Sequence, residues 1–171
     1  MANYVNLLII GAGGYGQVVK ELAEDSGKYN RIEFLDDNNS SAIGKIADSK
    51  NFLRDFPYAV IAIGNPAVRE KLFIELETVG FQLVNIMSAQ SKISSSAKLG
   101  KGCVIEPNIT VCANSVIGNG VILCAGSVVG HNATVRDYCQ IDYNGVVAVG
   151  AELPAGTKVA AGSVYKNQAK Q

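Results

Sequence analysis

The chain has a single histidine, His131, and this is the side chain best suited to move a proton at neutral pH. An imidazole titrates near pH 6.5, so it can act as a general base that accepts a proton from an attacking amine. A covalent nucleophile is not indicated, because Ser127 and Cys139 fall at inward positions of the repeat described below and neither has an acid–base pair around it. The alternative is that His131 is a surface residue without a function.

A second candidate site is the glycine-rich loop Gly11–Gly16, which follows the apolar run Val5–Ile10. Its Gly-x-Gly-x-x-Gly spacing, and an acidic residue, Asp36, twenty positions after Gly16, match the dinucleotide-binding fingerprint. The spacing indicates a tight turn, a close approach of the backbone to a phosphate, and an exposed helix N-terminus. The alternative is a tight strand-to-helix turn that binds no ligand.

The elements that would position this loop alternate between strands and helices. Apolar runs predict strands at Val5–Ile10, Ile32–Leu35, Tyr58–Ile63 and Leu83–Ile86, and helical spacing predicts helices from Gln17 to about Asp25 and from Pro66 to a stop at Gly80. This order is typical of a small parallel sheet with crossover helices, so we expect an α/β Rossmann-like domain. Such a domain has room for little more than one mononucleotide half. A single nucleotide carrying a group at its diphosphate is therefore favoured over a whole NAD.

His131 itself lies in a stretch that repeats every six residues. The apolar positions are Ile93, Leu99, Ile105, Val111, Ile117, Leu123, Val129, Val135, Ile141, Val147, Leu153, Val159 and Tyr165. A second column, at every sixth position from Ser96 to Gly162, holds Gly or Asn at ten of its twelve positions, and these residues adopt left-handed backbone geometry at little cost. The pattern predicts a hexapeptide parallel β-helix. Three six-residue sides make one coil of 18 residues, residues 93–164 make four coils, and His131 points outward.

The composition excludes several classes of protein. The 171 residues carry 15 basic and 15 acidic side chains, and this zero net charge gives no indication of nucleic acid or an anionic membrane as a partner. The apolar runs are too short for membrane insertion, and no signal-peptide pattern is present. With four cysteines, no Cys-x-x-Cys pair and one His, we expect no metal site and a reduced, cytoplasmic protein. We expect two domains, a Rossmann-like domain at 1–86 and a β-helix domain at 87–171.

The combination of these motifs resembles one bacterial family over nearly the whole chain. The motifs are Gly-Ala-Gly-Gly-Tyr-Gly at 11–16, Phe34-Leu35-Asp36-Asp37, Ala62-Ile63-Gly64-Asn65 with Arg69 and Lys71, and the hexapeptide repeat. They are similar to those of sugar acyltransferases that include UDP-4-amino-sugar N-acetyltransferases and sialic acid O-acetyltransferases. The resemblance implies a left-handed β-helix, homotrimers with active sites between neighbouring helices, acetyl-CoA as the acyl donor, and a nucleotide-activated amino sugar held by the N-terminal domain.

The resemblance also implies roles for individual residues. The family's catalytic histidine lies in a stretch matched here by residues 123–132, so His131 is expected to be the general base for direct attack of a sugar amine on the thioester. The implied nucleotide-sugar contacts are Gly11, Gly13, Gly14, Tyr15, Asp36, Asp37 and Gly64, and the implied acetyl-CoA contacts are Gly150, Lys158, Ala161 and Lys166.

Three positions depart from the family's pattern. Asn132 stands where an acidic residue commonly follows the histidine, Cys124 stands where Asn is common, and Tyr15 stands where His is common. A carboxylate that orients His131 could instead come from Asp137 or Asp142, in the same subunit or a neighbouring one.

Three other functions remain open. O-acetylation of a sugar hydroxyl, as in the sialic acid enzymes, would need the same base. A catalytically weakened, nucleotide-sugar-binding trimeric scaffold is the alternative from a different class, favoured by Asn132 and by a β-helix about one coil shorter than in typical members. An NAD-dependent enzyme is the weakest alternative, because no second mononucleotide half and no Tyr-x-x-x-Lys motif is evident.

Overall fold

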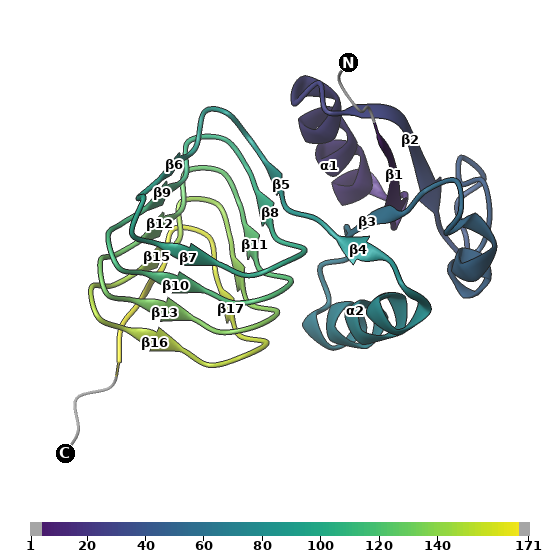
Figure 1. Ribbon diagram of the computed structural model, residues 1–171. Coiled ribbons are helices and arrows are strands. Elements are labelled where there is room, and N and C mark those ends of the chain that lie inside the picture. Colours follow the sequence, from purple (N-terminus) through teal and green to yellow (C-terminus); the bar gives the residue numbers. More distant parts are fainter. Residues whose placement is uncertain (1–4, 168–171) are drawn as a thin grey trace. The chain divides into compact units, whose positions relative to one another are not determined.

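The computed structural model describes residues 5–167, and the chain divides into two compact units between Ile86 and Met87. The N-terminal unit is an α/β sheet with crossover helices, and the second unit is a left-handed parallel β-helix (Figure 1). Both parts of the predicted fold class are confirmed.

The N-terminal unit is built on a four-stranded parallel sheet with the order β2-β1-β3-β4. Its elements are β1 Val5–Ile10, α1 Gly14–Asp25, β2 Tyr29–Leu35, the 3-10 helix Ile46–Phe52, β3 Tyr58–Ile61, α2 Pro66–Val79 and β4 Gln82–Leu83. The chain moves from β1 to β2 in one direction and from β3 to β4 in the other, so α1 and α2 lie on opposite sides of the sheet (Figure 1). The direction of winding reverses between β1 and β3, which is where open α/β sheets bind ligands.

Two of the sequence-based boundaries in this unit need correction. The predicted strand Leu83–Ile86 is wrong, because its backbone changes partner in the middle: the Val84 N–H still bonds the carbonyl of Ala59, whereas the Ser88 N–H bonds that of Ile105. The segment therefore forms β4 at the edge of the first sheet and β5 Ile86–Met87 at the start of the β-helix. In addition, β2 starts at Tyr29 rather than Ile32, because Tyr29 pairs with Val5 beyond a register shift.

The β-helix has three faces, each a stack of two-residue parallel strands (Figure 1). The first face comprises β5, β8 Val104–Ile105, β11 Ile122–Leu123, β14 Gln140–Ile141 and β17 Lys158–Val159. The second face comprises β6 Lys92–Ile93, β9 Thr110–Val111, β12 Val128–Val129, β15 Val146–Val147 and β18 Val164–Tyr165. The third face comprises β7 Lys98–Leu99, β10 Val116–Ile117, β13 Thr134–Val135 and β16 Glu152–Leu153. Paired residues are 18 positions apart, as in Ile117 with Val135 and Leu123 with Ile141, so the predicted coil length is confirmed.

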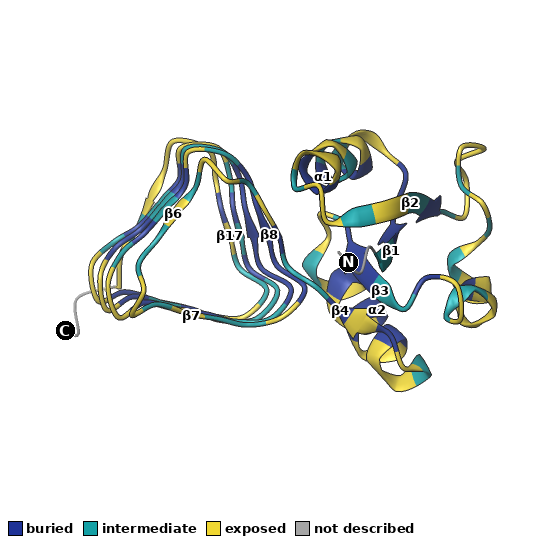
Figure 2. Ribbon diagram, turned by 45° about the horizontal axis from the view of Figure 1, so that its top comes forward, coloured by how far each residue is buried: buried dark blue, intermediate teal, exposed yellow. Residues whose placement is uncertain are grey.

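The predicted apolar column fills the inside of the coils. Ten of its thirteen residues are buried, and the remaining three, Ile93, Leu99 and Tyr165, are partly buried and pack against the cluster from the end coils. Figure 2 shows the buried residues as bands that follow the faces. Each buried Ile, Leu or Val stabilises the fold by about 1.5–3 kcal/mol, and only stacking makes this burial possible.

The predicted turn column also takes the expected conformation. From Gly102 to Gly162 every residue of the column has a positive φ, between 54° and 74°. Tyr138 is the one member of this set that is neither Gly nor Asn, and its φ is 59°. For most side chains other than Gly and Asn such geometry costs roughly 1–2 kcal/mol, which explains the choice of residues at the other positions.

Two buried serines in the coils provide a test of how hydrogen bonding contributes to this core. The Ser127 hydroxyl is buried without a hydrogen-bond partner, whereas the Ser115 hydroxyl donates to the carbonyl of Cys112 at 2.6 Å. We expect Ser127→Ala to be neutral or stabilising and its matched control Ser115→Ala to lower the free energy of unfolding by about 0.5–1.5 kcal/mol. Urea denaturation followed by circular dichroism measures the difference, and equal losses in both variants would contradict the assignment.

Candidate functional site

The glycine loop joins β1 to α1, and its glycines fall into two groups. Gly11 has φ +105°, and a side chain there would come within 3.0 Å of the Ala62 carbonyl oxygen, while a side chain at Gly16 would collide with the carbonyl oxygen of Gly11. These two glycines let the loop pack against the ends of β1 and β3. Gly13 and Gly14, in contrast, are exposed, and a Cβ at either position would meet nothing within 4 Å. Their backbone therefore faces open space at the N-terminus of α1.

No side chain caps the N-terminus of α1, so the helix start is open on that side. Gly13 is the N-cap residue and makes no side-chain cap, and no acidic residue lies in the first turn of α1. Free N–H groups at a helix start, together with the helix dipole, bind phosphate groups. Tyr15, in the same first turn, is half-buried.

Asp36 holds the glycine loop in place. Its Oδ2 accepts the Ala12 N–H at 2.8 Å, and its Oδ1 accepts the N–H groups of Asn38 and Asn39 at 2.8 and 3.0 Å. The Asn39 amide donates in turn to the Ala12 carbonyl at 2.8 Å. The bonds from Ala12 and Asn38 lower the pKa of the Asp36 carboxyl, which stays ionised. One lone pair of Oδ2 is left, so a ribose contact from Asp36 stays a prediction beside this positioning role.

The neighbouring loop, between β3 and α2, is also fixed from within. Arg69 is fully buried, and its Nη1 donates to the carbonyls of Ile63 and Gly64 at 2.8 and 3.0 Å. Asn65 caps α2 by accepting the Val68 N–H at 3.1 Å. Asp37, which was also expected to contact substrate, accepts the Ile46 N–H at 3.0 Å. The structure thus brings Gly11, Gly13, Gly14, Tyr15, Asp36 and Gly64 to the edge where β1 and β3 end.

His131 lies outward on the corner between the second and third faces of the β-helix, called here the His131 corner. Val129 before it is buried, and His131 and Asn132 are exposed. Along this corner the 18-residue register places Ala113 one coil before His131 and Val149 one coil after it. These small and apolar neighbours leave the imidazole accessible.

Asn132 is the residue that contacts the imidazole ring. Its Nδ2 lies 3.1 Å from His131 Nδ1. With Nδ2 donating, Nδ1 is the acceptor and the ring hydrogen sits on Nε2. Rotation of the amide by 180° presents Oδ1 instead, which moves the hydrogen to Nδ1 and leaves Nε2 as the basic nitrogen. An acid at this position would accept only, and would hold the ring in the second form.

Neither carboxylate that we considered as an orienting group lies on the His131 corner. Asp137 follows β13, on the corner between the third and first faces, where its Oδ1 accepts the Asn119 N–H at 2.7 Å. Asp142 follows β14, on the corner between the first and second faces. The amide of Asn132 is the polar side chain that meets the ring from within the described part of this chain.

The expected acetyl-CoA contacts are divided between two corners. Gly150 and Lys166 lie on the His131 corner, whereas Ala161 lies on the corner between the first and second faces, and Lys158 projects from β17 on the first face. Lys158 forms an ion pair with Asp142, with Nζ 3.0 Å from Oδ2. One copy of the chain does not bring this set together.

The buried thiols and hydroxyls of the β-helix are poor nucleophiles. All four cysteines are unbridged. Cys139 is buried, and its Sγ lies 3.0 Å from the Pro154 carbonyl oxygen. Burial, and the charges of Glu106 and Asp142, raise the pKa of the Cys124 thiol. Ser127 points into the core.

Two family models match the chain. Residues 6–76 match the PglD N-terminal domain, and residues 96–131 match the bacterial transferase hexapeptide (six repeats) model. The first match lies in the N-terminal unit and the second lies in the β-helix. These matches confirm the resemblance predicted from the sequence.

Relatives of both domains together are found among sequences and solved structures. UDP-N-acetylbacillosamine N-acetyltransferase of Bacillus subtilis (strain 168) is 26% identical over 110 residues, which cover 58% of this chain and 50% of that protein. The chain thus matches only about half the length of this curated relative. The acetyltransferase domain of PglB from Neisseria gonorrhoeae FA1090, solved with acetyl coenzyme A, aligns with a TM-score of 0.71 and 27% identity over 94% of this chain and 98% of that one. A mutant perosamine N-acetyltransferase from Caulobacter crescentus, solved with CoA and GDP-perosamine, has a TM-score of 0.79 at 23% identity over 94% and 88% of the two chains, and shows the same fold.

None of the helices in residues 5–167 has the length and apolar character required to span a membrane.

The two groups of glycines in the N-terminal domain predict different effects of substitution on stability. Gly16→Ala should lower the free energy of unfolding by about 1–3 kcal/mol, because the new Cβ meets a backbone carbonyl that cannot move freely. Gly13→Ala, the matched control, should change it by less than about 1 kcal/mol, since φ at Gly13 is −71° and the space around it is open. Thermal unfolding of both variants measures the difference. A similar loss in both would contradict this division of the loop.

Proposed function

We propose that the protein is an acetyltransferase that moves the acetyl group of acetyl-CoA onto the amino group of a nucleotide-activated sugar. The observation that carries this proposal is an exposed imidazole, His131, on a hexapeptide β-helix whose partner domain presents an open glycine loop at a helix N-terminus. The relatives named above, which act on or bind such sugars and coenzyme A, support it.

The N-terminal domain would hold the nucleotide sugar by its diphosphate. Gly13 and Gly14 leave the backbone N–H groups at the start of α1 open to phosphate oxygens, and the Asp36 clamp keeps this loop from collapsing. Arg69 fixes the loop beside it.

The chemical step is direct transfer without an acyl-enzyme. The sugar amine attacks the thioester carbonyl, and His131 accepts the proton that the nitrogen must lose before the tetrahedral intermediate can collapse and release the CoA thiolate. The buried Ser127 and the poorly acidic Cys124 offer no competing nucleophile. We include in the proposal a homotrimer with its sites between neighbouring β-helices, and a cytoplasmic location where acetyl-CoA is available.

The first prediction concerns the base. His131→Ala should lower kcat by about 10²–10⁴, the usual contribution of a general base, and leave nucleotide-sugar binding nearly unchanged. The rate of thiol release from acetyl-CoA is measured with a UDP-4-amino sugar and with GDP-perosamine from pH 5.5 to 9. Equal rates for the wild type and the variant across this range would remove His131 from the mechanism.

The second prediction concerns the nucleotide. Gly13→Val should abolish binding of UDP or GDP in calorimetry, because a branched side chain would occupy the space where the diphosphate approaches the backbone. Gly27→Ala, a change at a positive-φ turn after α1, serves as a control for general effects on this domain. Unchanged affinity in Gly13→Val would refute the role of the loop.

The third prediction concerns the tautomer of His131. Asn132→Asp places an acceptor-only group beside Nδ1 and should raise kcat about 10-fold at neutral pH, since Nε2 is then always the basic nitrogen. Asn119→Asp introduces the same charge on the corner between the third and first faces, where the side-chain oxygen still accepts the Lys101 N–H, and should leave kcat unchanged. A variant at 132 that folds normally and is no faster than the wild type would show that the amide does not limit catalysis.

A further inference from the structure

Three polar residues stack on the corner between the first and second faces, which we call the acidic corner. Glu106, Cys124 and Asp142 directly follow β8, β11 and β14 and are 18 residues apart, so they occupy the same place in three successive coils. Of the two carboxylates in this column, only Asp142 was expected from the sequence to have a role. The 18-residue spacing is the signal that links Glu106 to it.

The contacts within the acidic corner leave its negative charge only partly compensated. Asp142 Oδ1 lies 3.7 Å from Cys124 Sγ and 3.3 Å from Gln140 Nε2, and Lys158 pairs with Oδ2. Glu106 Oε2 accepts the Ala125 N–H at 3.1 Å. Two carboxylates thus face one ammonium group.

Glu106 contributes a buried oxygen for which residues 5–167 provide no donor within hydrogen-bond geometry. Glu106 is 3% exposed, and its Oε1 is buried without a hydrogen-bond partner. The charge of Glu106 is also the main reason why the pKa of the Tyr143 phenol is raised. The Tyr143 ring is exposed at the same corner. An unpaired buried carboxylate oxygen is costly unless a cation or donor lies nearby. A metal ion does not fit, since no group of three ligating side chains is found among residues 5–167.

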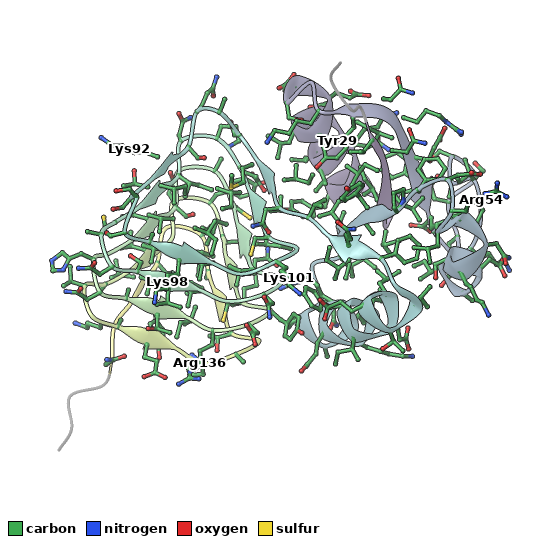
Figure 3. All side chains as sticks on the ribbon, in the orientation of Figure 1. Tyr29, Arg54, Lys92, Lys98, Lys101 and Arg136 are labelled. Atoms are coloured by element: carbon green, nitrogen blue, oxygen red, sulfur yellow. The ribbon has the colours of Figure 1, made fainter. Side chains whose placement is uncertain are left out.

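The second face, which borders the acidic corner, differs from the other two faces in its outward residues. From the second coil on, these residues are Thr110, Val128, Val146 and Val164. The outward residues of the third face are Lys98, Val116, Thr134 and Glu152, so both ends of that face carry a charge. Glu152 forms an ion pair with Arg136, which follows β13, and Figure 3 shows Lys98 and Arg136 projecting from these coils. On the first face the outward residues Val104 and Ile122 are already buried within the chain, and Gln140 and Lys158 follow them. The second face is therefore the one suited to burial against another β-helix.

The two corners that border the second face determine which residues of neighbouring copies come together in an assembly. The second face is bounded by the acidic corner on one side and by the His131 corner on the other. When three prisms surround a three-fold axis parallel to their own, each with its second face turned inward, neighbouring prisms meet at these corners. The His131 corner of one copy lies beside the acidic corner of the next.

We propose that the acidic corner of a second copy of this chain, with Asp142 foremost, faces His131 and supplies the carboxylate that Asn132 does not. This inference rests on the proposed role of His131 as the base. Asp142 is a positioning residue in this scheme, since it acts on the substrate only through the imidazole.

The axial positions of the residues agree with this arrangement. Rotation about a three-fold axis parallel to the coils leaves the height of every residue unchanged. His131 follows Cys124 by seven residues and precedes Asp142 by eleven, so its height lies between theirs. The Asp142 side chain is 20% exposed, and is thus within reach of a partner, with Glu106 as a further negative charge behind it.

The carboxylate would stabilise the imidazolium that forms when His131 takes the proton. On its own corner His131 has no carboxylate. The titratable groups of that column in the described residues are Cys112 in the preceding coil and Lys166 in the last one. A negative charge within about 4–6 Å favours the protonated ring by 1–3 pH units.

Because His131 is the only histidine, its ring protons can be followed directly by NMR in untagged protein. We expect Asp142→Asn to lower the pH midpoint of the ring titration by about one unit, and Glu106→Gln to lower it by less. Glu152→Gln removes the same charge from the third face and should leave the midpoint unchanged. A wild-type midpoint in Asp142→Asn would overturn the proposal.

A monomeric variant shows whether the effect comes from a second copy. Val146→Lys should break the trimer in light scattering, while Val116→Lys, the same change on the third face, should not. In the Val146→Lys background, Asp142→Asn should no longer move the His131 midpoint. A midpoint shift that persists in the monomer, or a trimer broken by the change at Val116 instead, would overturn the proposal.

These readouts do not depend on turnover, so the inference and the proposed function can fail separately. Loss of the coupling with normal thiol release would overturn the inference alone. Intact coupling with no acetyl transfer to any amino sugar would support the shared corner and overturn the proposed function.

Discussion

The closure of each coil after 18 residues is the constraint on which the rest of the β-helix depends. A strand of two residues cannot persist alone, and here each one is held by hydrogen bonds to the strands one coil before and after it. This stacking requires a left-handed turn every six residues and an inward apolar residue between turns. Asn108 and Gly120 at the turns, and Ile105 and Ile117 inside, show how each requirement selects its own residue type.

The same constraint decides where functional groups can stand. Because residues 18 apart share one place in successive coils, a column such as Glu106, Cys124 and Asp142 becomes a continuous feature of one corner. It also keeps corners apart, since a rigid, fully packed prism cannot bend to bring Asp142 toward its own His131. Chemistry that needs both corners must therefore use two copies of the chain. In the proposed assembly the fold thus makes activity depend on association.

Much of this architecture could be predicted from the sequence, because strict periodicity is a local signal repeated many times. The inward column from Ile93 to Tyr165 and the outward position of His131 followed from it directly. The split of Leu83–Ile86 between two sheets did not, because it depends on which backbone groups pair and not on hydropathy. The clamp made by Asp36 was also hidden. The fingerprint places an acid at that position, but only the folded loop shows that its oxygens bind Ala12 and Asn39 backbone groups.

Position 132 shows how the demands of the fold and of the chemistry compete at one residue. The turn there has φ 58°, which Asn adopts readily, while the proposed catalysis favours an acceptor that fixes the His131 tautomer. An amide meets the first demand fully and the second only in one of its two orientations. A carboxylate on a different corner, at a position that is free of the turn requirement, meets the second demand without disturbing the coil. Glu106 and Asp142 occupy such positions, directly after the strands and two residues before the left-handed turns at Asn108 and Asn144. In the proposed assembly the two tasks are divided between neighbouring copies, and this division is compatible with the repeat. A charged residue at the turn itself would have to adopt the left-handed conformation and also fix the tautomer of His131.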